Sequence, residues 1–202
     1  MNILIGVPTF ENVSVETFTS IYNLIFPQEI EKHELFFAKG YGAAQSRNII
    51  AKYAIQNEYD YILYVDSDIV LPPDALIKLL EQNTDITTGW YTCVFPDGSK
   101  NHSWVKFDEE TKQYICKFEE YGNPDPNAVM DVDACGFGCV LVKTNIFRQL
   151  QYPYFTYLEY SDGTVFAEDI YFCHLVRCTL PDIKIRGIRS VKCGHIKRQI
   201  LF

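Results

Sequence analysis

The sequence predicts an α/β protein in which a mostly parallel sheet is covered by helices and carries an inserted β-hairpin. Short apolar stretches alternate three times with segments of helical periodicity, which is the pattern of successive βα units. The second half instead contains closely spaced strand-like segments around a polar turn, which favours a hairpin. A length of 202 residues is enough for one domain with a substantial core.

The first βα unit opens the chain. Residues Ile3–Val7 form an apolar run that Pro8 and Thr9 end, as expected of a buried parallel strand that enters a loop. Ser14 is suited to cap the helix that follows, and Pro27 ends it. We expect the apolar residues of this helix to face the core because they recur at the i, i+3, i+4 and i+7 positions: Phe18, Ile21, Tyr22 and Ile25.

Two further βα units follow. Glu34–Ala38 is expected to form the second strand, and Gly40 and Gly42 mark the turn to a helix. Tyr61–Val65 has the composition of a third, buried strand, and Pro72 stands where the next helix opens. The buried faces of these helices are expected to be Ile49, Ile50, Tyr53 and Ala54 in one, and Leu76, Leu79 and Leu80 in the other.

The second half has a different pattern. Trp104–Phe107 and Tyr114–Phe118 are strand-like and flank a polar turn, so we expect a hairpin inserted at the edge of the sheet. An extended segment at Val129–Val142 is interrupted by Gly136 and Gly138. The other expected elements are a strand at Ile86–Thr92, a loop at 123–127, a helix from Glu168 with Phe172, Leu175 and Val176 inward, and strands at Ile183–Ile188 and Ser190–Cys193.

Composition limits the classes of partner. The net charge of -8 and the absence of a long Lys or Arg run disfavour a nucleic-acid partner. Seven cysteines without paired spacing are expected to be reduced thiols. The N-terminal segment lacks the pattern of a signal peptide, and no apolar stretch approaches the ~20 residues that cross a bilayer. We therefore expect a cytoplasmic protein with no membrane span, folded as a single domain over residues 1–202.

Two carboxylates directly follow the third strand. Asp66 and Asp68 lie at the carboxyl end of a central parallel strand, which is the edge where open α/β sheets bind ligands. Residues two apart in extended backbone point the same way, so both carboxylates can face one cation, or one ribose and the cation beside it. An ordinary solvated turn is the alternative interpretation.

A second pair of carboxylates, Glu168 and Asp169, stands at the start of a predicted helix. The helix dipole favours the ionised form there, and a general base for a hydroxyl group must be ionised. Simple capping of the helix by acidic residues is the alternative.

These segments resemble, in order, the motifs of glycosyltransferases similar to family 2. The strand, Asp-x-Asp motif and following helix match Tyr61–Leu76, and the donor-base loop matches Val7–Phe10. The remaining matches are the Ala-Arg-Asn-type helix start at Gly42–Asn48, the glycine-containing acceptor-side strand at Asp133–Val142, and the Glu-Asp pair in Phe166–Asp169.

The resemblance implies a Rossmann-like glycosyltransferase-A fold that binds a nucleotide-diphosphate sugar in about residues 1–95 and an acceptor in about residues 96–202. It implies that Asp169 is the catalytic base and that Glu168 contacts the acceptor or orients the loop. A late histidine completes the cation site in many enzymes of this fold, which assigns His195 as a ligand beside Asp68 and Asp66. Imidazole with carboxylates suits Mn²⁺ at least as well as Mg²⁺. An ordinary histidine near the C-terminus is the alternative.

Other residues are candidates for substrate contacts. Pro8 and Thr9 belong to the expected donor-binding loop. Arg47, at a helix start, is suited to grip a phosphate bidentately unless it forms a surface ion pair, and Asn48 is expected to orient the region of Asp66 on the donor side. Trp90, in the acceptor site, and the adjacent Tyr91 are candidate walls for a sugar ring, or core aromatics. On the same side, Gly136 and Gly138 are expected to let the backbone approach the ligand, or to mark a bulge.

The sequence thus predicts a metal-dependent transfer of a sugar to an acceptor hydroxyl, with inversion and a single addition. The acceptor is a glycan, lipid or protein that the sequence does not identify. Single addition is favoured because no Gln-x-x-Arg-Trp motif follows Asp169. The alternatives are a retaining transferase and a catalytically inactive nucleotide-sugar-binding protein. A nucleotidyltransferase is disfavoured because its glycine-rich loop is absent after the first strand.

Overall fold

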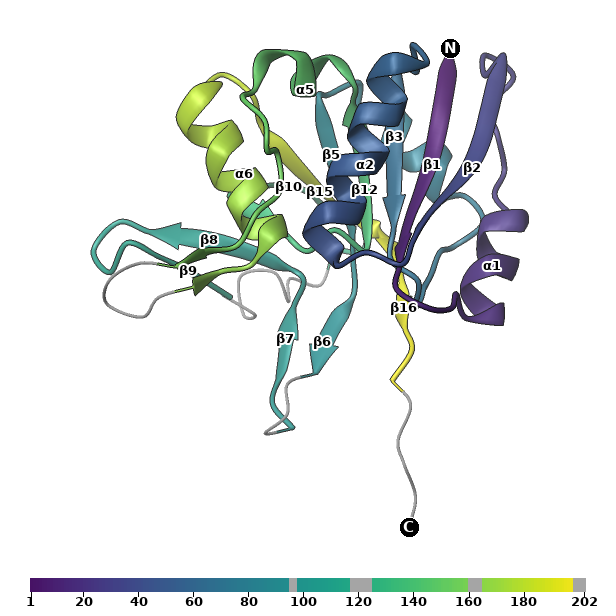
Figure 1. Cartoon of the computed structure of the whole chain (residues 1–202). Helices are drawn as coiled ribbons and strands as arrows, with labels where there is room; N and C mark the ends of the chain where they lie inside the picture. Colours follow the sequence, from purple (N-terminus) through teal and green to yellow (C-terminus); the bar gives the residue numbers. More distant parts are fainter. Residues whose placement is uncertain (95–97, 117–124, 160–164, 198–202) are drawn as a thin grey trace.

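The computed structural model describes residues 1–94, 98–116, 125–159 and 165–197 (Figure 1). A seven-stranded sheet with the order β10-β15-β5-β12-β3-β1-β2 forms its centre. The strands are β1 (Asn2–Thr9), β2 (Lys32–Lys39), β3 (Tyr61–Val65), β5 (Ile86–Trp90), β10 (Val129–Val132), β12 (Cys139–Lys143) and β15 (Ile185–Lys192).

Five of these strands run in one direction. β1 is parallel to β2 and β3, and β5 is parallel to β15. β12 lies antiparallel between β3 and β5, and β10 is antiparallel to β15. The expected mostly parallel sheet is therefore confirmed, and the carboxyl ends of β1, β2, β3 and β5 lie at one edge, which is the lower edge in Figure 1.

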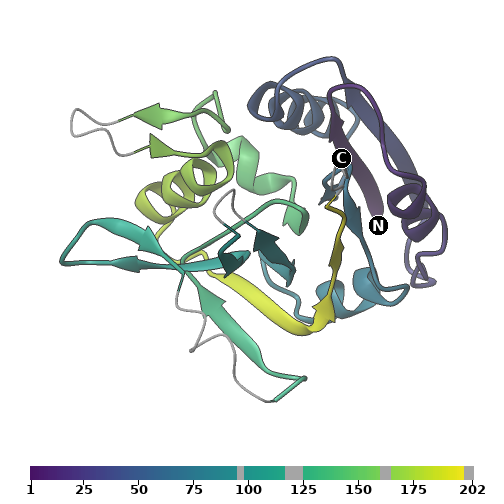
Figure 2. The ribbon, with the colours of Figure 1, turned by 90° about the horizontal axis from the view of Figure 1, so that it is seen from below.

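Each face of the sheet is covered by its own apolar core. Because side chains alternate along a strand, Leu4 and Ile62 pack on one face while Ile3 and Leu63 pack on the other. Figure 2 shows α2 and α3 on opposite sides of the sheet. The helices are α1 (Val15–Tyr22), α2 (Ala43–Gln56), α3 (Ala75–Glu81), α5 (Asn145–Gln149) and α6 (Glu168–Thr179).

Helix α1 begins as expected but presents a different face. Ser14 caps it, since the Ser14 hydroxyl accepts a hydrogen bond from the Thr17 amide at 3.0 Å. The expected inward face is wrong apart from Ile21, because the other apolar residues of the pattern are exposed. The helix ends at Tyr22, five residues before the predicted stop at Pro27. In place of the expected apolar residues, the small polar residues Thr17 and Ser20 are buried against the core.

The predicted hairpin is confirmed, but its place is different. β8 (Trp104–Asp108) pairs with β9 (Gln113–Ile115), and β8 also pairs with β11 (Ala134–Cys135) in a separate three-stranded sheet rather than at the edge of the main sheet. The buried Trp104 ring anchors this sheet by donating its indole N–H to the Gly89 carbonyl at 2.9 Å. Parts of the expected segments 114–118 and 123–127 lie outside the described residues.

Several short elements were not predicted. α5 is one, and the others are the pairs β4 (Ile69–Val70) with β16 (Gly194–His195), β6 (Thr92–Val94) with β7 (Lys100–His102), and β13 (Leu158–Glu159) with β14 (Val165–Phe166). The β4–β16 pair matters for the site because it aligns His195 with Ile69, next to Asp68. All seven cysteines are free thiols, as expected. Within the described ranges, no helix is long and apolar enough to cross a membrane.

Candidate active site

A cavity of about 450 Å³ opens at the carboxyl edge of the sheet. The loop after β1, the start of α2, the turn after β3 and the start of α6 all contribute to it. Four segments far apart in the sequence therefore meet at the edge where the strand order predicts a ligand. The lining residues are Pro8, Thr9, Phe10, Tyr41, Gly42, Ala43, Arg47, Asp66, Ser67, Asp68, Ala167, Glu168 and Asp169.

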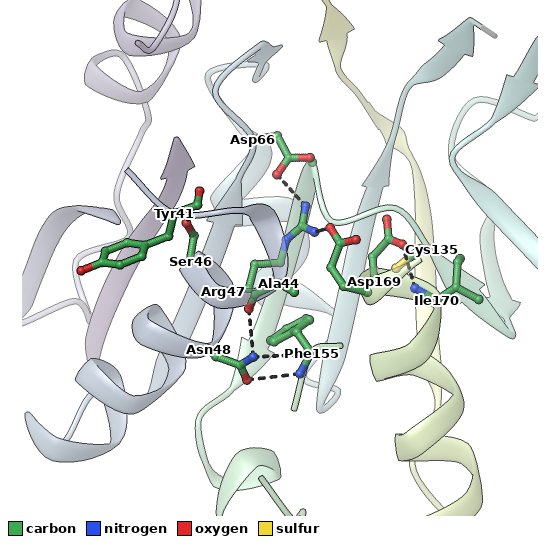
Figure 3. A network of polar contacts seen from close by, with 12 residues as sticks. Tyr41, Ala44, Ser46, Arg47, Asn48, Asp66, Cys135, Phe155, Asp169 and Ile170 are labelled. Carbon is green, nitrogen blue, oxygen red and sulfur yellow. Dashed lines mark hydrogen bonds and ion pairs between the residues drawn. The ribbon is translucent and has the colours of Figure 1, made fainter. Parts of the chain in front are cut away.

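Arg47 joins the two carboxylate pairs of the cavity. One terminal nitrogen donates to Asp66 Oδ1 at 2.8 Å, and the other donates to Glu168. Figure 3 shows the guanidinium lying between Asp66 and the start of α6, where Asp169 is located. The Arg47 side chain is 4% exposed, and its Nε lies buried without a hydrogen-bond partner among the described residues.

This geometry differs from the predicted role of Arg47. A guanidinium whose terminal nitrogens are paired with two carboxylates is not free to grip a phosphate bidentately. Burial acts to lower the pKa of Arg47, but the negative charges of Asp66, Asp169 and Glu168 outweigh it and raise that pKa. The alternative of an ion pair is closer to the structure, although the pair is buried rather than on the surface.

Asp169 has the electrostatic character of a base that titrates near neutrality. Burial raises the pKa of Asp169 to about 6, the Arg47 charge opposes this rise, and the Glu168 charge adds to it. Its Oδ1 accepts a hydrogen bond from the Ile170 amide at 2.8 Å. Glu168 is more deeply buried and is occupied by Arg47, so Asp169 is the carboxylate of the pair that remains available in the cavity.

Asp68, the second carboxylate of the motif, is in contact with His195. His195 Nε2 is 3.2 Å from Asp68 Oδ2, and its Nδ1 is 2.9 Å from the Thr92 carbonyl. When Nδ1 carries the proton, it donates a hydrogen bond to this carbonyl, and Nε2 points toward Asp68. Many histidines that bind metals are oriented in this way, with one ring nitrogen fixed by a carbonyl and the other directed at the site. Lys197 approaches the same carboxylate at 3.9 Å, and a second cavity of about 320 Å³ continues past Asp68 toward it.

The donor set fits a divalent cation only in part. Among the described residues, no group of three or more His, Cys, Asp or Glu side chains is arranged to hold a metal. Asp68 and His195 supply one oxygen and one nitrogen, which suit Mn²⁺, and a diphosphate and water are able to complete the shell. Asp66, the third predicted ligand, is paired with Arg47.

Asn48 does not reach the donor side of the cavity. Its amide nitrogen donates to the carbonyls of Ala44 and Phe155, and its oxygen accepts from the amides of Tyr154 and Phe155, at distances of 2.7 to 3.2 Å (Figure 3). The predicted role in orienting Asp66 or binding the donor is therefore wrong in this structure. The side chain instead fixes residues 154 and 155 against α2, because these bonds occupy both ends of its amide.

Trp90 is held away from the cavity. Its indole N–H donates to the Arg189 carbonyl at 2.8 Å, and its ring stacks on His102 with centroids 4.7 Å apart. The described residues that line the main cavity do not include Trp90. The prediction of an acceptor wall is not supported, and the alternative of a structural aromatic describes this ring.

The two predicted acceptor-side glycines make room for a tyrosine. A Cβ on Gly136 would lie 2.3 Å from the Tyr91 hydroxyl, and one on Gly138 would lie 2.7 Å from the Tyr91 ring. The Tyr91 hydroxyl also accepts a hydrogen bond from the Gly138 amide at 3.3 Å, and its ring meets His195 edge-on. These glycines are therefore explained by packing rather than by close approach to a ligand.

Sequence reasoning missed Tyr41, an aromatic residue at the site. Phe10 and Tyr41 line the cavity, whereas Tyr91, a candidate sugar wall, is buried against Gly136 and Gly138. Phe10 carried a signal through its place in the motif after β1, but Tyr41 lies on a loop with no periodic pattern. The structure brings Pro8, Thr9, Asp66, Asp68, Glu168 and Asp169 together in the lining of one cavity, and their roles in binding and catalysis stay predictions.

The chain resembles known proteins in both sequence and structure. No family model matches the chain. The chain is 24% identical to the vanadate resistance protein of Candida albicans over 61% of its length, and 26% identical to the mannan polymerase complex subunit mnn9 of Schizosaccharomyces pombe over 62%. These matches span 35% and 45% of the curated relatives.

Solved structures match nearly the full length of the chain. The fold matches A197 from STIV with a TM-score of 0.64, 17% identity and coverage of 98% of this chain and 87% of that one. The structure of GalNAc-T7 with UDP, GalNAc and Mn²⁺ matches with a TM-score of 0.63 and 13% identity, and the match covers 98% of this chain and 43% of that one. The structure of S. aureus TarS residues 1–349 with UDP-GlcNAc matches with a TM-score of 0.54 and 15% identity, and the match covers 98% of this chain and 60% of that one. The chain therefore has the nucleotide-diphospho-sugar transferase fold, the glycosyltransferase-A fold that its motifs implied.

Proposed function

We propose that this protein is a glycosyltransferase that moves a sugar from a nucleotide-diphosphate donor to an acceptor hydroxyl. The observation that carries the proposal is the single cavity that Asp66 and Asp68, from the end of β3, line together with Asp169, from the start of α6. A single cavity thus offers carboxylates for the donor and its cation together with a candidate base for the acceptor.

The similar proteins support this choice of chemistry. GalNAc-T7 and TarS were solved with a nucleotide or a nucleotide sugar, and the matched subunit mnn9 belongs to a mannan polymerase complex. All three names concern sugar transfer or its donors. We infer a nucleotide-diphosphate sugar as the donor of this chain, and we treat the whole chain, residues 1–202, as one glycosyltransferase-A unit.

The proposed mechanism uses the two sides of the cavity differently. Asp68 and His195 would hold Mn²⁺ or Mg²⁺, and Asp66 would face the ribose or the cation. When bound, this cation would neutralise the negative charge that develops on the leaving diphosphate. Asp169 would remove the proton of the attacking hydroxyl. Attack from the side opposite the diphosphate inverts the anomeric carbon, and with no polymerase-type motif after Asp169 we propose one addition per binding event.

Donor binding is expected to require a divalent cation. Both Asp66 and Asp68 line the cavity, and the protein carries a net charge of -8, so a diphosphate meets unfavourable charge without a cation. Calorimetric titration with UDP and with GDP, each in manganese and in EDTA, measures this. We expect nucleotide binding to be at least about tenfold weaker in EDTA, because the loss of a residue that only supports a metal ligand already costs about tenfold in metal affinity. Equal affinity in both buffers would contradict the cation requirement.

Loss of the His195 imidazole is expected to weaken manganese binding by about tenfold or more, since changes even beyond the direct ligands cost about 10 to 100-fold. The measurement is manganese affinity of His195→Ala by electron paramagnetic resonance in the presence of nucleoside diphosphate. His33→Ala is the matched control, because His33 stacks on Phe26 far along the chain from the motif. Unchanged affinity in His195→Ala would remove this histidine from the proposed cation site.

A panel of nucleotide sugars tests the activity itself. Manganese-dependent hydrolysis of the donor needs no acceptor, so it identifies the nucleotide and the sugar before the acceptor is known. Binding of a nucleotide sugar without any hydrolysis or transfer would instead support the alternative of an inactive binding protein.

A further inference from the structure

A chain of hydrogen-bonded side chains ends at an exposed thiol on α6. Cys178 Sγ lies 3.5 Å from Nε2 of His174, which is one turn earlier on the helix. His174 Nδ1 lies 3.1 Å from the hydroxyl of Tyr114 in β9, and this hydroxyl accepts a hydrogen bond from Arg177 Nη1 at 3.4 Å. The thiol therefore has a histidine within reach, and that histidine is oriented by a third group. Cys178 and Glu168 lie at opposite ends of α6, so this cluster is separate from the candidate active site.

The imidazole of His174 is held by packing as well as by hydrogen bonding. Its ring meets the Tyr114 ring edge-on with centroids 6.0 Å apart, and the Phe166 ring in the same way with centroids 5.5 Å apart. Burial, followed by the positive charge of Arg177, lowers the pKa of His174, so the imidazole is neutral at neutral pH. When Nδ1 carries the ring proton and donates it to Tyr114, Nε2 is free to accept the thiol proton of Cys178.

The other cysteines do not share this setting. Among the seven cysteines, all of which lie in the described ranges, only Cys178 is exposed. Burial raises the pKa of Cys93 to about 11 and also raises the pKa of Cys116, which keeps these half-buried thiols protonated. The remaining four are buried. Because a reagent must reach the sulfur and the sulfur must lose its proton, one thiol of the chain is singled out for reaction.

We propose that Cys178 is a modification site that reacts with low-molecular-weight disulfides such as glutathione disulfide. The Cys178 sulfur attacks one sulfur of the disulfide, and the bond between the two reagent sulfurs breaks. His174 Nε2 takes the thiol proton and passes it to the leaving thiolate, so the products are a mixed disulfide on Cys178 and one free thiol. A divalent metal is disfavoured here, because Arg177 adds positive charge beside His174 and the described residues offer no group of three metal-binding side chains.

The rate of thiol exchange tests the site without any transfer reaction. The native protein is mixed with dipyridyl disulfide, whose leaving group is followed by its absorbance. We expect one fast thiol, which is absent from Cys178→Ser. His174→Gln is expected to slow it by about fivefold or more, because the acceptor of the thiol proton is lost. Tyr114→Phe keeps the aromatic ring and loses only the hydroxyl, so we expect a smaller decrease that a purely structural role of the ring would not produce.

A second readout locates the modification. After incubation with glutathione disulfide, mass spectrometry is expected to find the glutathione adduct on Cys178. His33→Gln is the matched control, because His33 stacks on Phe26 rather than contacting a thiol, and its rate of exchange is expected to equal that of the unmodified protein. Equal rates in His174→Gln and His33→Gln would overturn the proposal, as would a fast thiol that persists in Cys178→Ser. Neither result would bear on the proposed sugar transfer, since the candidate base lies at the other end of α6.

Discussion

Replacement of Asp169 by asparagine is expected to lower the rate of sugar transfer by about 100-fold or more, with little change in donor affinity. Asparagine has nearly the same shape but cannot accept the proton of the attacking hydroxyl. Asp169 is the carboxylate of the α6 pair that Arg47 leaves available in the cavity. The measurement is the transfer rate together with the donor dissociation constant, once the donor and acceptor are identified.

Glu168→Gln is the matched variant at the adjacent position. Because the Glu168 carboxylate is bound to Arg47, we expect this change to act through the geometry of the site and to be milder. A dead Glu168→Gln protein beside an active Asp169→Asn protein would exchange the two roles. Two active variants would favour the retaining mechanism, in which no base is needed at this place.

The same assignment predicts how the rate depends on pH. A base acts in its ionised form, and burial raises the pKa of Asp169 to about 6. The transfer rate is therefore expected to be low below that pH and to increase as the pH is raised through about 6. A rate that is flat from pH 5 to pH 8 at saturating metal and donor would contradict Asp169 as the base.

Replacement of Arg47 by alanine is expected to lower the free energy of unfolding by about 3 to 5 kcal/mol. This guanidinium is the shared cation of Asp66 and Glu168, and its removal leaves a buried carboxylate beside Asp169 without a partner. Urea unfolding followed by circular dichroism measures the loss. Arg47→Lys is expected to be intermediate, because one ammonium group cannot reproduce the planar fork that reaches two carboxylates.

Arg148→Ala is the matched control for this prediction. Arg148 makes an exposed contact with the Ile55 carbonyl at 3.3 Å, and its removal is expected to change stability by no more than about 0.5 kcal/mol. If Arg47→Ala unfolds at the same urea concentration as Arg148→Ala, the bridge does not stabilise the fold. Its role would then be limited to the electrostatics of the cavity.

Local patterns predicted the first and third strands well because a buried strand leaves a direct trace in the sequence, whereas the two strands expected at Ile183–Ile188 and Ser190–Cys193 are one strand, β15. Tyr61–Val65 was predicted with its observed bounds as β3, and the apolar run at Ile3–Val7 became the centre of β1. Periodicity misled at α1, where Phe18 and Tyr22 follow a helical repeat yet are exposed. The repeat defines one face of a helix, but it does not determine which side the neighbouring elements cover.

The sequence by itself determined the α/β character of this protein, the carboxylates at the end of β3 and those at the start of α6. Tertiary structure decided how these groups meet. Arg47 and Glu168 are 121 positions apart, and only the packing of α2 against α6 brings them into contact. The same holds for His195 and Asp68, which the β4–β16 pair aligns. Periodicity and capping arise from interactions within a few residues, whereas a bridge between distant segments depends on the shape of the folded chain.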